Sequence, residues 1–172
     1  MDKVNFRILT YNSTGFADDK KEFIVDIINK YSPDIVFIQE TWLLPSRRNA
    51  ALRSLHKSYL ADGISSVSDE ELLLGRPYGG LGILWRKSMA ASVRFRTITN
   101  TSRACAIEVE AHNGTMTLIN TYMPVDTQRK NAVSDEFLDT MDKIETLYYC
   151  TRKCPSLPHD ECPSLPHSHV PT

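Results

Sequence analysis

The chain has 172 residues, of which 41% are hydrophobic and 24% charged, and 20 Lys and Arg side chains nearly balance 21 Asp and Glu. This length predicts about one domain, and the charge balance excludes a disordered acidic tail and a strongly basic nucleic-acid coat protein. An enzyme that acts on nucleic acid through a metal ion is not excluded.

The amino-terminal part of the chain predicts a strand, a helix and a second strand. The segment Val4–Tyr11 is rich in β-formers, and a helical apolar pattern follows it. Asp18 and Asp19 favour the start of this helix, and Ser32-Pro33 ends it because the residue before proline avoids the α region. The apolar run Asp34–Glu40 predicts a buried strand. A right-handed crossover would make the two strands parallel, so that their carboxyl ends share one edge.

The rest of the chain predicts a layered α/β sandwich. The predicted elements are a helix at Arg47–Lys57, a polar loop at 62–78, strands at Leu81–Arg86 and Ser92–Ile98, a hairpin of Arg103–Ala111 and Thr115–Tyr122 around His112-Asn113-Gly114, and a helix at Thr127–Tyr149. Asn-Gly is the strongest short hairpin signal. The apolar positions expected to face inward from these two helices are Ala51, Leu52, Leu55, Val133, Phe137, Leu138, Met141, Ile144 and Tyr148.

The composition changes at about residue 150. The segment Cys154–His159 (CPSLPH) recurs as Cys162–His167. Two prolines in six residues exclude a helix and a central strand. We therefore predict a domain at residues 1–149 and a disordered, low-complexity tail rich in Pro, Cys and His at residues 150–172.

No segment predicts a membrane span or a secretion signal. The longest strongly apolar run, Ile35–Ile38, is far shorter than the ~20 residues of a spanning helix. Asp2 and Asn5 occupy the positions where a signal peptide has its basic end and its apolar stretch. We expect an intracellular protein, in the cytoplasm or the nucleus, that does not associate with membranes.

Two polar residues close the first two predicted strands. Asn12 lies at the end of the first strand and Glu40 at the end of the second, on the edge where open α/β sheets bind ligands. Their amide and carboxylate oxygens are hard donors, which suit Mg²⁺ or Mn²⁺ better than zinc. We interpret them as candidate metal ligands, and the alternative is two solvated residues at strand ends.

Two further features lie at predicted strand ends. Tyr122 closes the strand that starts at Thr115, where its phenolic O–H could donate to a phosphate oxygen whose charge grows during transfer. The alternative is a half-buried aromatic side chain with its hydroxyl in water. Gly79 and Gly80 could allow close approach of the backbone to a ligand, or they could mark a bulge or turn.

Four segments, in this order and with this spacing, resemble successive motifs of the endonuclease/exonuclease/phosphatase family, which has the deoxyribonuclease I-like fold. The segments are Thr10–Gly15 (TYNSTG), Asp34–Trp42 (DIVFIQETW), Tyr78–Ile83 (YGGLGI) and Asn120–Pro124 (NTYMP). The stretch Gln39–Trp42 is most similar to the endonuclease domains of non-LTR retrotransposons. The resemblance covers about residues 4–149.

The resemblance implies a fold, a cofactor and roles for individual residues. Asn12 and Glu40 would bind a divalent metal ion, Mg²⁺ or Mn²⁺, and Tyr122 would face the scissile phosphate of DNA. The residues that would shape the strand ends without acting chemically are Asn120, Gly79 and Gly80. The implied fold is the N-terminal half of a four-layer α/β sandwich, in which two sheets pack face to face with helices outside.

The second half of the family's pattern is missing from this sequence. It contains no Gly-Asp-x-Asn segment and no Ser-Asp-His triplet, which would carry the general base. Ser134-Asp135-Glu136 lacks the His, and His159-Asp160 lies between prolines, so neither replaces them. Thr14 stands where some relatives carry an acidic residue. We expect a fragment of a Mg²⁺-dependent phosphodiesterase, most closely a retrotransposon-type DNA endonuclease, with little or no activity and with exposed apolar surface prone to aggregation.

Two alternatives remain. The first is a non-catalytic remnant that binds nucleic acid or a protein through basic patches, which would be drawn from Arg47, Arg48, Arg53, Arg86, Lys87, Arg94 and Arg96. The second is a zinc site in the tail, although its Cys and His spacing matches no common zinc site well.

Overall fold

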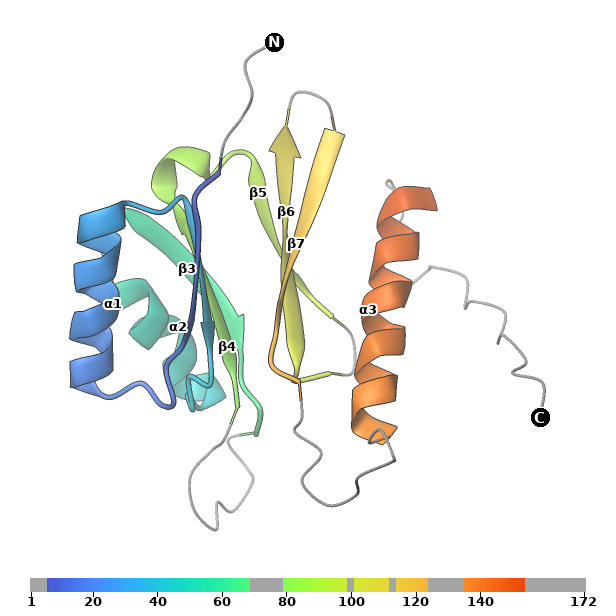
Figure 1. Ribbon diagram of the computed structural model, residues 1–172, viewed down its shortest axis with the longest axis horizontal. Coiled ribbons are helices and arrows are strands. Elements are labelled where there is room, and N and C mark those ends of the chain that lie inside the picture. Colours follow the sequence, from blue (N-terminus) through green and yellow to red (C-terminus); the bar gives the residue numbers. More distant parts are fainter. Residues whose placement is uncertain (1–5, 69–78, 99–100, 112–113, 124–134, 154–172) are drawn as a thin grey trace.

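The computed structural model describes residues 6–68, 79–98, 101–111, 114–123 and 135–153. The elements are β1 (Ile8–Asn12), α1 (Asp18–Tyr31), β2 (Ile35–Gln39), α2 (Pro45–Ser54), β3 (Tyr59–Ile64), β4 (Leu81–Arg86), the short 3-10 helix η1 (Lys87–Met89), β5 (Val93–Thr97), β6 (Ala104–Ala111), β7 (Gly114–Thr121) and α3 (Asp135–Lys153). Two sheets lie face to face, with α1 and α2 outside one and α3 outside the other (Figure 1). The predicted four-layer α/β sandwich is therefore confirmed.

The strand–helix–strand unit forms as the sequence predicts. Asp18 and Asp19 lie in the first turn of α1, where the helix dipole favours negative charge. Ser32 caps the helix in the left-handed region, with φ 46°, and its amide donates to the carbonyl of Ile28. β1 runs parallel to β2, with Asn12 opposite Gln39, so both strands end at one edge of the sheet.

The sheets have the orders β1-β2-β4-β3 and β5-β6-β7. The predicted hairpin is confirmed, because β6 and β7 pair antiparallel along their length. The prediction of a loop from residue 62 is wrong at its start, since β3 extends to Ile64 and pairs with β4. Asp62 and Gly63 are poor strand formers, and it is pairing that makes this segment a strand. Gly63 lies opposite Gly82, where a Cβ on Gly63 would come within 2.2 Å of the Leu81 carbonyl oxygen.

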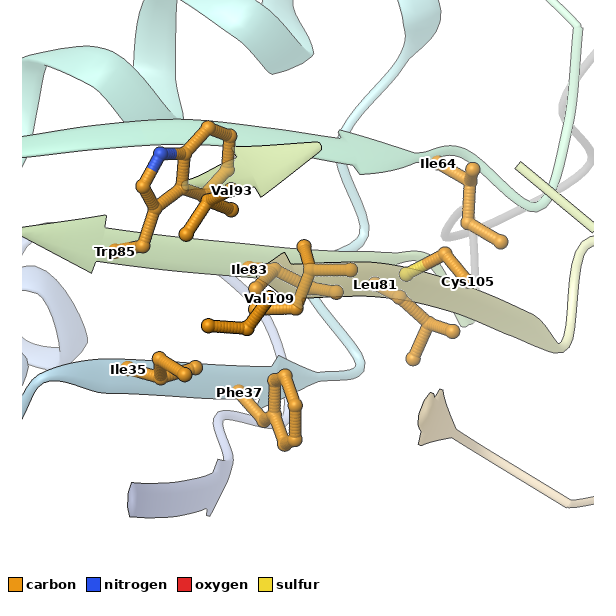
Figure 2. Packing of buried hydrophobic residues seen from close by; sticks show 10 residues of the cluster. Ile35, Phe37, Ile64, Leu81, Ile83, Trp85, Val93, Cys105 and Val109 are labelled. Atoms are coloured by element: carbon orange, nitrogen blue, oxygen red, sulfur yellow. The ribbon is translucent and has the colours of Figure 1, made fainter. Parts of the chain in front are cut away.

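The main core lies between the two sheets (Figure 2). Ile35 and Phe37 of β2 and Ile83 of β4 face Ile107 and Val109 of β6 across the sandwich. A second cluster fills the space between the first sheet and its helices; its buried members are Ile24, Ile28, Val36, Ile38, Leu52, Leu55, Tyr59, Ala61 and Leu84. Both faces of β2 are therefore buried, as its continuous apolar run predicts.

The last helix differs from its prediction. α3 spans Asp135–Lys153, where the sequence predicts 127–149, and residues 127–134 lie outside the described part of the chain. Ile144 packs against the outer face of the second sheet. Leu138 and Met141, which we expected to face inward, are 51% and 45% exposed. The helix rests on a small patch that includes Ala104 and Ala106, so only part of its apolar stripe is covered. Val133 and the side chain of Tyr148 lie outside the described residues.

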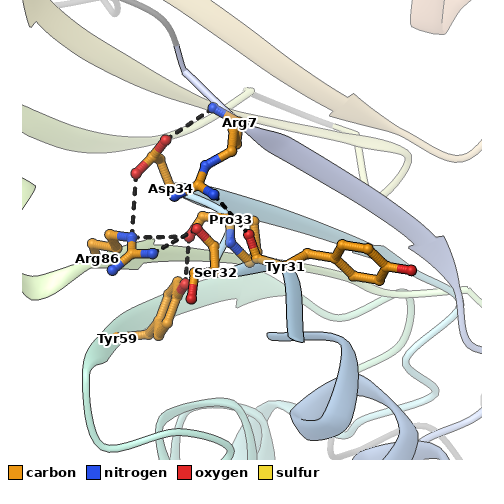
Figure 3. Close-up of polar contacts among 7 residues, drawn as sticks. All are labelled: Arg7, Tyr31, Ser32, Pro33, Asp34, Tyr59 and Arg86. Carbon is orange, nitrogen blue, oxygen red and sulfur yellow. Dashed lines mark hydrogen bonds and ion pairs between the residues drawn. The ribbon is translucent and has the colours of Figure 1, made fainter. Parts of the chain in front are cut away.

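A polar cluster fixes the amino end of β2 (Figure 3). The Arg86 Nε lies 3.2 Å from Asp34 Oδ1 and donates to the Pro33 carbonyl, and another guanidinium nitrogen donates to the Ser32 carbonyl. The Tyr59 hydroxyl also donates to the Pro33 carbonyl, and the Arg7 amide donates to Asp34. This cluster ties β1, β3 and β4 to the turn between α1 and β2, at the opposite end of β2 from Gln39.

Two further sequence predictions, on membrane spans and on the tail, can be compared only with the described residues. The helices in the described part of the chain are all too short or too polar to cross a membrane. The repeat of the predicted tail falls in residues 154–172, which lie outside the described residues, as does Tyr78 of the third motif.

Candidate functional site

Asn12 and Glu40 meet at the carboxyl edge of the first sheet. Asn12 is the last residue of β1, and Glu40 directly follows β2. The Asn12 side-chain amide donates a hydrogen bond of 2.6 Å to Oε1 of Glu40. The two candidate metal ligands are therefore adjacent because the strands that carry them are parallel and in register.

The loop after β1 is bonded to the residues after β2. Ser13 is buried, and its hydroxyl donates to the carbonyls of Gln39 and Glu40 at 2.9 and 3.1 Å. The amide of Gly15 donates to the Glu40 carbonyl at 2.7 Å. Thr14 donates its amide to Oδ1 of Asn12 at 3.1 Å. These bonds fix the backbone under both candidate ligands.

Backbone strain gathers at this edge. Thr14, Glu40 and Trp42 have φ of 48°, 54° and 54°, in the left-handed region that residues other than glycine rarely adopt. Each such residue costs of order 1–3 kcal/mol and persists only where its surroundings impose it, which happens most often at functional sites.

Gly79 and Gly80 support the residues around Glu40. Their carbonyls accept hydrogen bonds from the amides of Trp42 and Thr41, at 2.9 and 3.1 Å, and so continue the pairing of β2 with β4 past the strand ends. Gly80 has φ +79°, and a Cβ there would lie 2.7 Å from the Thr41 hydroxyl oxygen. This position therefore requires glycine for both its backbone conformation and its close contact.

Tyr122 reaches the same place from the second sheet. It follows β7 directly, and its amide donates to the Arg103 carbonyl at 2.9 Å. Burial, then the charge of Glu40 and a hydrogen bond to its carboxylate, raise the pKa of Tyr122, and Arg103 opposes this effect. The Arg103 guanidinium lies 5.7 Å from the centre of the Tyr122 ring. The phenol is therefore a neutral hydrogen-bond donor beside the candidate metal ligands.

Asn120 lies one layer deeper than Tyr122. It is buried, and its amide bonds to Gln39 and to two backbone carbonyls of the first sheet. The structure thus brings together all six residues that the sequence singled out. Gln39 and Arg103 were missed, because nothing in a single sequence distinguishes a Gln inside a motif or an Arg before a strand from surface residues.

The donor set at this edge fits a hard divalent cation. Glu40 supplies a carboxylate and Asn12 an amide group, both at the surface end of the sheet. In the described residues, no group of three or more His, Cys, Asp and Glu side chains is arranged to hold a metal ion. Mg²⁺ commonly uses one or two carboxylates and keeps several waters, whereas structural zinc needs four N or S ligands. The residues present fit Mg²⁺ or Mn²⁺ and do not fit zinc.

Comparisons with known proteins bear on the family and the fold of the chain. Residues 9–169 match the model of the Endonuclease/Exonuclease/phosphatase family. No curated protein sequence matches the chain. The match starts in β1 and includes every described element after it.

Solved structures share the fold at low identity. The AP endonuclease LMAP from Leishmania major is 15% identical over 69% of this chain and 40% of its own, with a TM-score of 0.54. The 3′ phosphatase NExo from Neisseria, bound to a product DNA hairpin, is 19% identical over 84% and 51%, with a TM-score of 0.53. The endonuclease domain of TRAS1, a telomere-specific non-LTR retrotransposon, is 10% identical over 83% and 53%, with a TM-score of 0.54. The chain therefore spans about half the length of these structures.

Proposed function

The chain belongs to the endonuclease/exonuclease/phosphatase family, and we propose that it is the metal-binding half of a Mg²⁺- or Mn²⁺-dependent phosphodiesterase that acts on DNA, an endonuclease of the retrotransposon type. Members of this family generally depend on a divalent metal ion. The observation that carries the proposal is the cluster of Asn12, Glu40 and Tyr122, which joins the two sheets at one edge. We also propose an intracellular location, in the cytoplasm or the nucleus.

Each residue of the cluster has a defined task in this proposal. Asn12 and Glu40 hold the metal ion, and a bound Mg²⁺ would polarise the phosphoryl oxygen and stabilise the leaving oxygen. Tyr122 keeps its proton and donates a hydrogen bond to a non-bridging phosphate oxygen.

We propose further that this chain alone cleaves DNA very slowly or not at all. The sequence has neither Gly-Asp-x-Asn nor Ser-Asp-His, so no side chain in it is assigned to activate water. General-base catalysis typically contributes a factor of roughly 10²–10⁴. A chain that binds the metal without that base should be far slower than a whole enzyme.

Metal binding is the direct test. Isothermal titration of the 172-residue chain with Mn²⁺ should show one site that Glu40→Gln weakens at least about tenfold, the effect of losing a charged ligand. Glu110→Gln is the matched control, since Glu110 is an exposed carboxylate at the far end of β6. Equal affinities for the wild type and Glu40→Gln would refute the metal site.

Cleavage is tested separately. Supercoiled plasmid incubated with Mg²⁺ and the chain should remain almost uncut. Robust nicking that disappears in Glu40→Ala would show that the chain is an active nuclease and would refute the part of the proposal that concerns inactivity.

The structure does not favour a non-catalytic remnant that binds through basic patches. Three arginines that could form such a patch pair with carboxylates: Arg53 with Asp62, Arg86 with Asp34 and Arg96 with Glu108. Paired charges contribute less to an electrostatic patch than free ones.

A further inference from the structure

The core between the sheets ends in a polar layer. Phe37 of β2 and Leu118 of β7 belong to the apolar cluster between the sheets. Two residues further along each strand stand Gln39 and Asn120, and Gln39 Nε2 donates to Oδ1 of Asn120 at 2.6 Å. This amide pair therefore lies between the apolar core and the edge that carries Glu40 and Tyr122.

Asn120 is buried, with 1% of its surface exposed, and its side chain makes three hydrogen bonds to the first sheet. Its side-chain nitrogen donates to the carbonyls of Ile38 in β2 and Gly82 in β4, each at 3.1 Å. Gln39 also donates to the Thr10 hydroxyl in β1 at 3.1 Å. The pair thus joins the edge strand of the second sheet to three strands of the first.

Stability alone does not explain a buried amide pair at this place. A hydrogen bond contributes little net stability, and a matched apolar pair can be as stable, whereas one amide left without its partner is costly. Apolar contacts between sheets have no direction and tolerate small shifts, but hydrogen bonds fix a relative position. Glu40 follows Gln39 directly, and Tyr122 lies two residues after Asn120, so this relative position sets the distance between the site residues.

We propose that Gln39 and Asn120 are positioning residues, which hold Tyr122 of the second sheet against Glu40 of the first. This inference deepens the proposed function and rests on it for its catalytic meaning. The geometric claim, that the amide pair sets the contact between Tyr122 and Glu40, is tested without any activity measurement.

The experiment replaces both amides at once. The double variant Gln39→Met with Asn120→Leu has apolar side chains of similar size and leaves neither amide without its partner. The carbonyls of Ile38 and Gly82 lose a donor, so its urea midpoint should fall, and the contacts below are measured where the variant is folded. Nuclear Overhauser contacts between the Tyr122 ring and the Glu40 side chain, measured in the full chain with labelled Tyr and Glu, should be lost. Ile107→Val is the control, because it removes a methyl group from the same core and should keep these contacts.

Two outcomes would overturn the proposal. The first is a folded double variant that keeps the contact between Tyr122 and Glu40. The second is loss of the contact in Ile107→Val as well, which would mean that any change in the core disturbs it. If the double variant does not fold, the single variant Gln39→Met decides by the same contacts, since Gln39 is only partly buried. If the wild-type chain binds no Mn²⁺, the proposed function is refuted. The contact measurements on the double variant still test whether the amide pair positions Tyr122 relative to Glu40.

Discussion

The Arg86 cluster predicts a large effect of one side chain on stability (Figure 3). The perturbation is Arg86→Met, which keeps most of the aliphatic stem and removes the guanidinium group. The variant loses the ion pair with Asp34, at 3.2 Å, and the hydrogen bonds to the carbonyls of Pro33 and Ser32, at 3.1 and 2.5 Å. The cation–π contact of the guanidinium with the Tyr59 ring, 5.8 Å from its centre, is lost as well.

The size of the effect follows from the exposure of the pair. The side chains of Arg86 and Asp34 are 30% and 22% exposed, so neither is fully desolvated. Breaking a fully buried ion pair costs roughly 3–5 kcal/mol and an exposed pair about 0–1 kcal/mol. We therefore expect Arg86→Met to lower the free energy of unfolding by about 2–3 kcal/mol, including the two carbonyls left without this donor.

Urea unfolding followed by circular dichroism measures this loss. Arg94→Met is the control, because Arg94 is exposed and its hydrogen bonds within the described part of the chain go to the nearby carbonyls of Ala91 and Val93. The double variant of Arg86→Met with Asp34→Asn should cost less than the sum of the single variants. A loss below about 0.5 kcal/mol for Arg86→Met, similar to an ordinary surface substitution, would refute this reasoning.

Three further predictions follow from the same structure. Gly80→Ala should lower the free energy of unfolding by at least about 1–2 kcal/mol, because alanine at φ +79° is strained and its Cβ would meet the Thr41 hydroxyl. Urea unfolding measures this loss. Titration of the variant with Mn²⁺ should show weaker binding than the wild type. Burial raises the pKa of Tyr59 above 10.0, so the neutral phenol stabilises the fold at lower pH and this contribution is lost as the pH rises above 10.0. Tyr59→Phe should be less stable than the wild type at neutral pH but should lose less stability on that rise, and equal pH profiles would contradict this account. Cys105 is fully buried, which raises the pKa of its thiol, so in a variant with serine at the other three cysteines it should react with a thiol reagent only in urea. Rapid labelling of the native protein would show that this core opens.

The sequence predicts most of the elements because their patterns are local. The Asn-Gly turn indicates the hairpin, and the apolar run of β2 indicates a buried strand. No strand was predicted where β3 lies, because Asp62 and Gly63 depend on pairing with β4, which no local pattern reports. The exposed positions of Leu138 and Met141 depend on how much of α3 the second sheet covers, which is again a tertiary property.

The predicted site residues meet, but the contacts that hold them could not be read from the sequence. Strand ends and parallel pairing place Asn12 beside Glu40, and this follows from topology alone. The position of Tyr122 depends on how the second sheet packs on the first. That packing is fixed in part by Gln39 and Asn120, which are far apart in the sequence.

Glu40, a candidate metal ligand, does not follow the alternation of side chains between the two faces of the sheet, and its backbone conformation explains why. Alternation places Ile35, Phe37 and Gln39 on the face toward the second sheet, so an extended Glu40 would point to the opposite face, toward the helices. With φ of 54° the backbone leaves the extended region at this residue, and the charge of its carboxylate acts on Tyr122 of the second sheet, whose pKa it raises. Ser13 and Gly15 donate hydrogen bonds to the Glu40 carbonyl, and the carbonyls of Gly80 and Gly79 accept from the next two amides of the segment, so the segment is held in that strained conformation. The local rule is broken where the two sheets must contribute to one site, and strain at Glu40 is the physical cost of bringing its carboxylate to Tyr122.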